Sequence, residues 1–410
     1  MRGFLEKIFP KGVFILPVIV AAFGYFVDVF DMYIFGANRV ASLTAIGVPK
    51  DEIFDTGVMI LNLQMAGMFI GGLLFGVLGD KFGRTKMMFL SIVTYSIATF
   101  MNGLVDNVAA YATFRFIAGL GLAGELGLAI TLISETLPKD KRGYGAGIIC
   151  GFGILGGLSA ALLALVIPWR VSYIIGGLMG FALLFFRVRI GESRMFESTK
   201  EHKHKGKISM VFAKPERMKR FLLCVCMLLP TWYVIGVLVT FSPELLKVKY
   251  GLEVTVPPIL AFTLFFLALS DFVSAWISNA VRSRKKVLIG FISLGIIMVL
   301  TLLLSPVALN YQALLVIYIG MGIGCGCWVL GVTTASESFG TNLRATITTS
   351  VPNFSRAPTI PITLSVVTLK EHMPLDQAAL IVGIVVYALA LFGAYATRET
   401  FAEDLDYLEE

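Results

Sequence analysis

Charge is scarce in this sequence. Asp, Glu, Lys and Arg make up only 15% of the 410 residues, while 57% are hydrophobic. A soluble domain has about a quarter of its residues charged and under half apolar. Here the apolar residues form blocks of about 20 or more, long enough to cross a bilayer as helices. The composition excludes an ordinary soluble domain and predicts a membrane protein.

Cysteine and histidine are also few, and neither is placed for chemistry. The cysteines lie inside apolar runs, where the two residues of a C-x-C pair face different sides of a helix, so we interpret them as packing residues. The histidines lie in loops, which excludes an intramembrane histidine as proton carrier. These residues are Cys150, Cys224, Cys226, Cys325, Cys327, His202, His204 and His372.

Other classes of protein lack support as well. No nucleophile–base pair, metal-ligand cluster, repeated pore loop or signalling domain is visible, so we expect no cofactor, no metal and neither an enzyme nor a channel. The first apolar run, from Val13, is too long for a signal peptide and has no small-residue cleavage site after it. We expect it to remain as a membrane helix.

The apolar runs predict an all-α membrane protein with twelve spanning helices. The longest polar stretch, 187–220, holds eleven lysines and arginines and separates two groups of six. We expect an N-terminal bundle over residues 1–190, a basic cytoplasmic linker over 191–218 and a C-terminal bundle over 219–410. The expected helices are 12–37, 54–78, 87–104, 108–135, 144–167, 170–189, 219–245, 256–281, 287–304, 311–335, 345–369 and 376–397.

The charges of the loops predict the orientation. If both termini are cytoplasmic, the cytoplasmic segments hold 26 of the 34 lysines and arginines, and the opposite face holds six. This asymmetry follows the positive-inside rule. The net charge of +7 therefore reflects topology and not nucleic-acid binding. We expect a multi-pass, monomeric protein of a plasma membrane, in a bacterium the inner membrane, with the lipid bilayer as its surroundings.

Two polar patterns recur at half the chain length. The basic turn Gly79–Lys86 has a worn copy at Asn279–Lys286, and a glutamate followed seven positions later by an arginine occurs twice, about 202 residues apart. Two parallel six-helix halves are typical of transporters whose halves are related by an axis along the membrane normal. The two glutamate–arginine pairs are Glu135 with Arg142 and Glu337 with Arg344.

Several motifs resemble a known family. They are Gly76-x-x-x-Asp80-Lys-Phe-Gly83-Arg84, then Arg115-Phe-Ile-Ala-Gly119-Leu-Gly121 with Gly124-Glu125, then Glu135-x-x-Pro138-x-x-x-Arg142-Gly143, then Glu192-Ser-Arg-Met-Phe-Glu197, and the tail Arg398-Glu399-Thr400 with Asp404-Leu405. Together they resemble the major facilitator superfamily, and within it the metabolite:proton and aromatic-acid:proton symporter branches. The resemblance implies alternating access around a central cavity surrounded by helices 1, 4, 7 and 10.

The resemblance also implies a cytoplasmic gate. In it, Asp80 pairs with the other half of the protein when the cytoplasmic side is shut. The alternative is a stop-transfer anchor whose charges only set topology. The second copy lacks the acidic residue at Ala280 and the glycines at Ser283 and Ala345, so a latch there should be weaker. The expected gate residues are Gly79, Asp80, Gly83, Arg84, Glu135, Arg142, Arg284, Glu337 and Arg344.

Charges inside the expected helices are the candidates for proton coupling, because each is costly within a bilayer. Asp28 and Asp31 are three residues apart and share a helix face. By helical rise they lie roughly 4–9 Å to the outer side of the helix midpoint, and Arg115 lies about 7 Å to the outer side of its own. Two nearby carboxylates favour protonation of one, and a nearby arginine opposes it. The set is either a proton carrier or a static ion pair.

Glu125 is a further candidate for proton coupling. It lies about 7 Å to the cytoplasmic side of the midpoint of the same helix as Arg115. Its neighbours Gly119, Gly121, Gly124 and Gly127 allow close helix packing. Glu125 is therefore either a second proton station or a hydrogen-bonded packing residue.

Arg356 is the candidate anchor for a substrate. It lies near the middle of an expected helix that carries three prolines in the eleven residues 351–361, and interrupted helices near the midplane point to a binding site. Asn353 is one turn away, and Asp271 lies at similar depth in the helix 256–281. Arg356 either pairs with Asp271 or binds a substrate carboxylate through its planar fork. Aromatic residues that could contact substrate are Tyr33, Trp232, Tyr233 and Trp328.

The sequence thus predicts a secondary transporter that imports a small organic anion or zwitterion, such as a carboxylate or amino acid, together with protons. One alternative is a proton-driven exporter of drugs or of a metabolite such as a siderophore. Another is a membrane nutrient sensor on a transporter scaffold.

Overall fold

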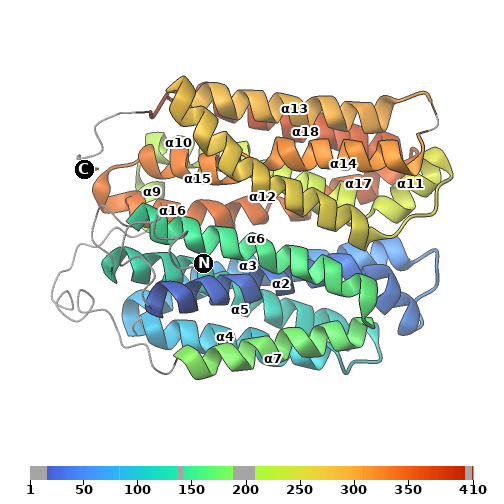
Figure 1. The fold of residues 1–410 in the computed structure, drawn as a ribbon, viewed down its shortest axis with the longest axis horizontal. Helices are drawn as coiled ribbons and strands as arrows, with labels where there is room; N and C mark the ends of the chain where they lie inside the picture. The colour runs from blue at the N-terminus through green and yellow to red at the C-terminus, as the bar shows by residue number, and fades with distance from the viewer. Residues whose placement is uncertain are drawn as a thin grey trace, which may run out of the picture.

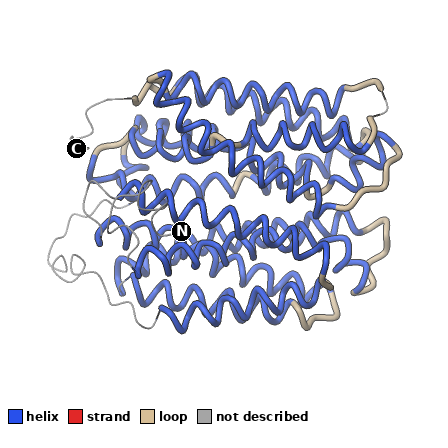
Figure 2. Tube along the Cα trace, in the orientation of Figure 1, coloured by secondary structure: helices blue, strands red, loops and turns tan. Residues whose placement is uncertain are grey.

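The structure is a computed structural model and describes residues 16–82, 84–136, 142–187, 208–307, 309–401 and 409. Long helices lie along the longest axis of the molecule, with loops joining them at both ends (Figure 1, Figure 2). Helices α2 to α7 form one bundle and helices α10 to α18 the other. We call the end with the α2–α3 turn at 46–52 the outer end and the end with the α12–α13 turn at 282–283 the inner end, after the predicted orientation.

The first bundle consists of six long helices, one for each spanning helix that the sequence predicts. Helices α4 and α5 pack on one another, as do α3 and α5, and α2 packs on α6. The bounds are α2 Leu16–Ala45, α3 Ile53–Phe82, α4 Arg84–Asn102, α5 Val108–Thr136, α6 Arg142–Val166 and α7 Trp169–Arg187.

The second bundle has more elements, because three of its spanning helices are interrupted. A short helix α9 precedes it, and α11 follows the first interrupted helix. The bounds are α9 Ile208–Ala213, α10 Pro215–Tyr233, the π-helix η2 Val234–Val239, α11 Ser242–Tyr250, α12 Val256–Val281, α13 Arg284–Leu304, α14 Tyr311–Cys325, α15 Trp328–Glu337, α16 Thr341–Arg356, α17 Thr359–Lys370 and α18 Leu375–Ala396.

Length and composition support the membrane assignment. Among the described residues, eight helices are long and apolar enough to cross a membrane, and shorter apolar helices cover 108–124 and 151–166. Large apolar side chains such as Phe272, Trp276 and Tyr395 remain more than 60% exposed on the helix surfaces. Apolar surface on helices of this length is what a bilayer covers.

The first helix is longer than the sequence predicts. The expected end at residue 37 is wrong, because α2 continues to Ala45. The polar residues Asn38 and Arg39 end the apolar run but not the helix, since both are buried inside the protein. Asp31 consequently lies near the middle of α2 and not on its outer side.

Each interrupted helix has a local cause. Pro230 lacks an N–H and lies just before the π-turns of η2, where Thr240 Oγ1 donates to the Ile235 carbonyl at 2.7 Å. Helix 311–335 breaks between Cys325 and Trp328, where a Cβ on Gly326 would lie 2.2 Å from the Ser270 Cβ of α12. Helix 345–369 breaks at Ala357–Pro358 and begins earlier than expected, at Thr341.

In the first bundle, glycines let α3 and α5 touch through their backbones. A Cβ on Gly71 would lie 2.1 Å from the Leu120 carbonyl oxygen, and one on Gly119 would lie 2.3 Å from the Gln64 carbonyl oxygen. Real atoms cannot approach so closely, so only glycine fits this crossing. The crossing fixes α5, and with it Arg115, against the rest of the bundle.

We predict that Gly119→Leu lowers the free energy of unfolding by about 1–3 kcal/mol, the cost that is typical of overpacking, because the backbones of α3 and α5 must separate. The measurement is thermal unfolding of the purified protein in detergent. Gly290→Ala is the matched control, because a Cβ there meets nothing within 4 Å. Equal unfolding temperatures for the two variants would contradict the packing argument.

Candidate functional site

A small cavity, which we call the central cavity, lies between the two bundles. Its wall includes Tyr33 from α2, Met65 from α3, Trp232 from α10, Leu260 from α12 and Thr359 from α17. The volume of about 20 Å³ is room for about one water molecule. Both halves of the chain therefore close on this cavity, and a substrate enters only if they move apart.

Within the first bundle, Asp31 and Arg115 form a buried ion pair. Arg115 Nη2 donates to Asp31 Oδ1 at 3.1 Å and to Thr99 Oγ1 at 3.3 Å, and its Nη1 donates to the Asp31 backbone oxygen at 3.3 Å. Thr99 also donates to Asp31 Oδ1, at 2.7 Å. The Arg115 side chain is 0% exposed and the Asp31 side chain 1%. Helices α2, α4 and α5 thus converge on one buried carboxylate.

An aromatic ring lies against the arginine of this pair, and one oxygen of its carboxylate has no hydrogen-bond partner among the described residues. The Arg115 guanidinium carbon lies 4.9 Å from the centre of the Tyr173 ring. Asp31 Oδ2 has no hydrogen-bond partner among the described residues, so this oxygen can accept a proton without breaking a bond. Asp28, one turn earlier, is also buried.

Arg356 ends α16, directly before the break in that helix. Its Nη1 donates to Asn353 Oδ1 at 3.1 Å, and its guanidinium carbon lies 5.6 Å from the centre of the Trp232 ring. The residue is only 4% exposed. Within the described part of the chain, no carboxylate forms an ion pair with it. Arg356 is thus a buried cation beside the wall of the central cavity, held by an amide and an aromatic ring.

Asp271 does not pair with Arg356 in this structure. Its Oδ1 accepts the backbone N–H of Val329 at 3.1 Å, which places the carboxylate at the N-terminus of α15. A helix N-terminus carries unsatisfied N–H groups and favours a negative charge. Asp271 therefore stabilises the break between α14 and α15. Sequence reasoning missed this role because the break itself was not predicted.

The four candidate aromatic residues divide into two sets. Tyr33 and Trp232 line the cavity, and Trp328 stands edge-on to Trp232 with ring centres 5.7 Å apart. Trp232 also donates its indole N–H to Ser355 Oγ at 3.3 Å. Tyr233 points elsewhere: its hydroxyl donates to the Ala379 carbonyl at 2.7 Å, inside the second bundle.

At the outer end, polar contacts join the two bundles. Arg39, 0% exposed, donates from Nη2 to both carboxylate oxygens of Glu244 at 2.6 and 2.7 Å and to the Thr240 carbonyl at 3.1 Å. Lys370 pairs with Asp55 at 2.5 Å. Thr363 Oγ1 donates to Asn62 Oδ1 at 2.6 Å. These contacts hold the outer end closed.

Comparison with known proteins identifies the family. The profile described as Major Facilitator Superfamily matches residues 16–357. The chain belongs to the major facilitator superfamily. The sialic acid transporter NanX of Escherichia coli (strain K12) is 34% identical over 182 residues, 43% of this chain and 45% of that protein. The niacin transporter NiaP of Acinetobacter baylyi is 31% identical over 268 residues, 57% of this chain and 60% of that protein.

The matches to both of these relatives span less than two thirds of the relative's length. A structure of the xylose transporter XylE from E. coli, in an inward-open conformation, superposes with a TM-score of 0.72 at 15% identity and covers 95% of this chain and 97% of its own. This likeness confirms the predicted fold of twelve spanning helices in two six-helix bundles. As a member of this superfamily, the chain is a multi-pass membrane protein of a transporter family.

Most of the predicted gate of this superfamily protein cannot be placed. Gly83 lies outside the described residues, and the surroundings of Gly79 and the side chains of Asp80, Arg84, Glu125, Glu135 and Arg142 are likewise not described. The second copy is described. Arg284 Nη2 pairs with Glu337 Oε1 at 3.2 Å, and Arg344 follows in α16. Both members of this pair belong to the second bundle, so the pair holds α13 to α15 and does not join the halves.

Glu399 completes the inner end of the second bundle. Burial raises the pKa of Glu399, but hydrogen bonds from Ser283 Oγ and from the backbone N–H groups of Arg284, Phe401 and Lys285 outweigh it and leave the pKa below its ordinary value of 4.5. The carboxylate is therefore ionised at neutral pH. The stabilisation that it gives is present at neutral pH and is lost as the pH falls through this lowered pKa. Sequence reasoning quoted Glu399 in a motif without assigning it a role.

Sequence reasoning also missed the Arg39–Glu244 pair. Arg39 lies in the outer part of the first helix of the first bundle, and Glu244 follows the first spanning helix of the second bundle. The two lie 205 residues apart, close to the spacing of the internal repeat. Opposite charges at nearly equivalent positions of the two halves are the signal that could have revealed the contact.

We predict that Glu244→Gln opens the outer end, because Arg39 is left buried without its counter-charge. Removing one partner of a buried ion pair costs about 3–5 kcal/mol, and each 1.4 kcal/mol changes a population ratio about tenfold. The measurement is the distance distribution between spin labels at Thr44 and Val248 in a cysteine-free background, in which a longer component should appear. Glu253→Gln, which removes an exposed pair with Lys247, is the control. An unchanged distribution in Glu244→Gln would refute the role of this pair in closure.

Proposed function

We propose that this transporter imports a small organic anion or zwitterion with protons, by alternating access between its two bundles. The observation that carries the proposal is the buried guanidinium of Arg356. It lies beside the central cavity, and the described residues offer it an amide and a ring but no carboxylate. A buried cation without a counter-charge is costly, so a substrate that brings a carboxylate would bind where that cost is relieved.

The geometry around Arg356 suits a planar anion. A guanidinium binds a carboxylate through two parallel hydrogen bonds, and Arg356 Nε has no partner among the described residues. Asn353 already orients Nη1. The rings of Trp232 and Trp328 stand beside the anchor, where they could contact the organic part of the substrate, with Tyr33 facing from the first bundle.

The Asp31–Arg115 pair is the proposed proton carrier. When Asp31 is ionised, Arg115 neutralises it; when Asp31 is protonated at Oδ2, the pair loses one charge and its attraction weakens. Helices α2, α4 and α5 meet at this pair, so the change bears on how the first bundle packs. Asp28, one turn away on the same helix, is the second proposed proton-carrying carboxylate. The side chain of Glu125 remains a candidate proton station by sequence alone.

Direction and gating complete the proposal. The closed outer end and the nearly filled central cavity fit a state in which the outer path is shut. With the inner end cytoplasmic, the motif at Gly79–Arg84 with Glu135 and Arg142 would act as the opposing gate. The proposed direction is import. The names of the relatives state transport of sialic acid and of niacin and support a small organic acid as the substrate. The bacterial inner membrane is the proposed location.

We predict that Arg356→Lys weakens substrate binding at least tenfold, because a point charge replaces a two-pronged donor and a hydrogen bond to a charged group contributes about 1.5–3 kcal/mol. Thermal-shift screening of the wild type against carboxylates, amino acids and nucleosides, with niacin and sialic acid as first probes, identifies the ligand. Titration of that ligand then compares the variants. Arg170→Lys, at an exposed pair with Asp106, is the control. Unchanged affinity in Arg356→Lys would argue against a bidentate anchor.

We predict that Asp31→Asn abolishes substrate-driven proton uptake in liposomes but leaves exchange of substrate across the membrane, because the amide accepts hydrogen bonds but cannot carry the proton. Asp31→Glu should restore part of the proton movement. Asp28→Asn is measured in parallel, and Asp106→Asn, an exposed residue, is the control. Full proton movement in both the Asp31→Asn and the Asp28→Asn proteins would exclude this pair of carboxylates as carrier.

A further inference from the structure

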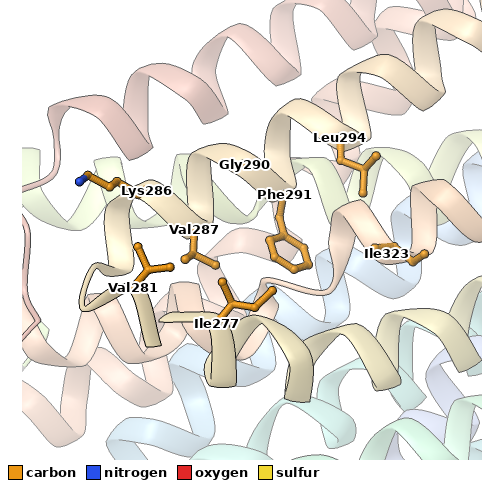
Figure 3. Close-up of a pocket in the computed structure, with 8 residues that line it drawn as sticks. All are labelled: Ile277, Val281, Lys286, Val287, Gly290, Phe291, Leu294 and Ile323. Carbon is orange, nitrogen blue, oxygen red and sulfur yellow. The ribbon is translucent and has the colours of Figure 1, made fainter. Parts of the chain in front are cut away.

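A groove lies on the surface of the second bundle, away from the central cavity. Figure 3 shows it between α12, α13 and α14, near the α12–α13 turn. Its volume is about 390 Å³, far more than the central cavity. Apolar side chains form its walls, among them Val281, Val287, Phe291 and Ile323. Because these helices span the membrane, the groove faces the hydrocarbon of the bilayer near its inner boundary.

One charged residue borders the groove. Lys286 lies at its inner end, with the ammonium group pointing away from the apolar residues (Figure 3). Its side chain is exposed and forms no ion pair or hydrogen bond within the described residues. The neighbouring cations are engaged: Arg284 pairs with Glu337 and Lys285 donates to the Tyr395 carbonyl. Among the described residues that line the groove, Lys286 thus supplies a positive charge with no ion-pair partner at the mouth of the groove.

The turn that presents Lys286 is rigidly held. The backbone N–H of Lys286 donates to Ser283 Oγ at 3.1 Å, and the backbone N–H of Arg284 donates to Glu399 Oε1 at 2.8 Å. Arg282, in the left-handed conformation, closes α12 and has an exposed side chain. The backbone from which the Lys286 side chain extends is therefore held in place by hydrogen bonds.

We propose that this groove binds one anionic phospholipid, with an acyl chain along Val287, Phe291 and Ile323 and the phosphate at Lys286. An apolar groove next to a cation at the inner boundary of the membrane matches a molecule with a hydrocarbon tail and a negative head. Basic residues at this depth attract anionic headgroups. The inference goes beyond the proposed transport function and does not depend on the substrate.

Gly290 provides a direct way to fill the groove. It is one of the lining residues, and a Cβ added there meets nothing within 4 Å. A leucine at this position would therefore occupy the space of the acyl chain without clashing with the protein. Variants at Lys286 and Gly290 test the two parts of the ligand independently, because Lys286 would contact the headgroup and Gly290 the acyl chain.

The experiment uses the full chain, purified in mild detergent and stripped of lipid. Binding of dioleoylphosphatidylglycerol and dioleoylphosphatidylcholine is measured by native mass spectrometry and by the rise in unfolding temperature. We expect the wild type to prefer phosphatidylglycerol. Lys286→Gln should weaken phosphatidylglycerol binding about fivefold and leave phosphatidylcholine unchanged, and Lys286→Glu should weaken it further. Gly290→Leu should reduce binding of both lipids, with an unfolding temperature in lipid-free detergent equal to that of the wild type.

Two controls match these variants. Lys50→Gln removes an exposed lysine at the outer end, and Ala388→Leu adds an apolar side chain at an exposed position of α18; both should bind lipid as the wild type does. Equal phosphatidylglycerol affinity in the wild type and in both Lys286 variants would overturn the proposal, whatever the behaviour of Gly290→Leu. So would a wild-type dimer that Gly290→Leu dissociates, because the groove would then hold a second copy of the chain.

Discussion

Buried charge in a membrane-spanning bundle requires a counter-charge, and this constraint organises the interior of the protein. Arg115 meets Asp31 within the first bundle, and Arg39 meets Glu244 between the bundles. Asp271 meets the N-terminus of α15 instead of a cation. Arg356 alone among these groups has only an amide and an aromatic ring. The first three groups have an opposite charge or a helix N-terminus as partner within the protein, whereas Arg356 carries the charge that we propose a substrate neutralises.

The two bundles solve the packing problem differently. In the first, glycines such as Gly71 and Gly119 bring continuous helices into backbone contact, which suits a site where one ion pair must keep its geometry. In the second, three helices are interrupted at η2, between α14 and α15, and between α16 and α17. Two of these interruptions lie beside Trp328 and Arg356. Breaks leave backbone groups and side chains available near the midplane. Arg356, the buried cation without an ion-pair partner among the described residues, accordingly belongs to the second bundle.

The sequence predicted the helices well because apolar runs of membrane length have few other solutions. The predicted end of α2 was wrong because that prediction relied on the apolar run alone. Arg39 interrupts this run, but it stays buried in the helix because it pairs with Glu244 of the other half, and no local pattern of the sequence contains that contact. The proximity of Asp31 and Arg115 followed from the helix order that the family resemblance implies, although the depth assigned to Asp31 rested on the wrong end of α2. Asp271 could not be assigned, because its partner is a helix N-terminus that exists only where α14 and α15 separate.

The Arg39–Glu244 pair is suited to the reversible closure of the outer end that the proposed transport cycle requires. Arg39 is fully buried, while Glu244 keeps about a quarter of its side chain exposed. If the bundles separate at this end, both groups regain water, so the Coulomb attraction that is lost is offset by hydration that is regained. A closure of this kind is stable without being permanent. The apolar contact of Phe54 with Phe241, whose ring centres lie 4.9 Å apart, also holds the outer end together. Exposing these rings to water regains no favourable hydration, unlike exposing the ion pair. The balance between the two kinds of contact therefore sets how readily the outer end opens.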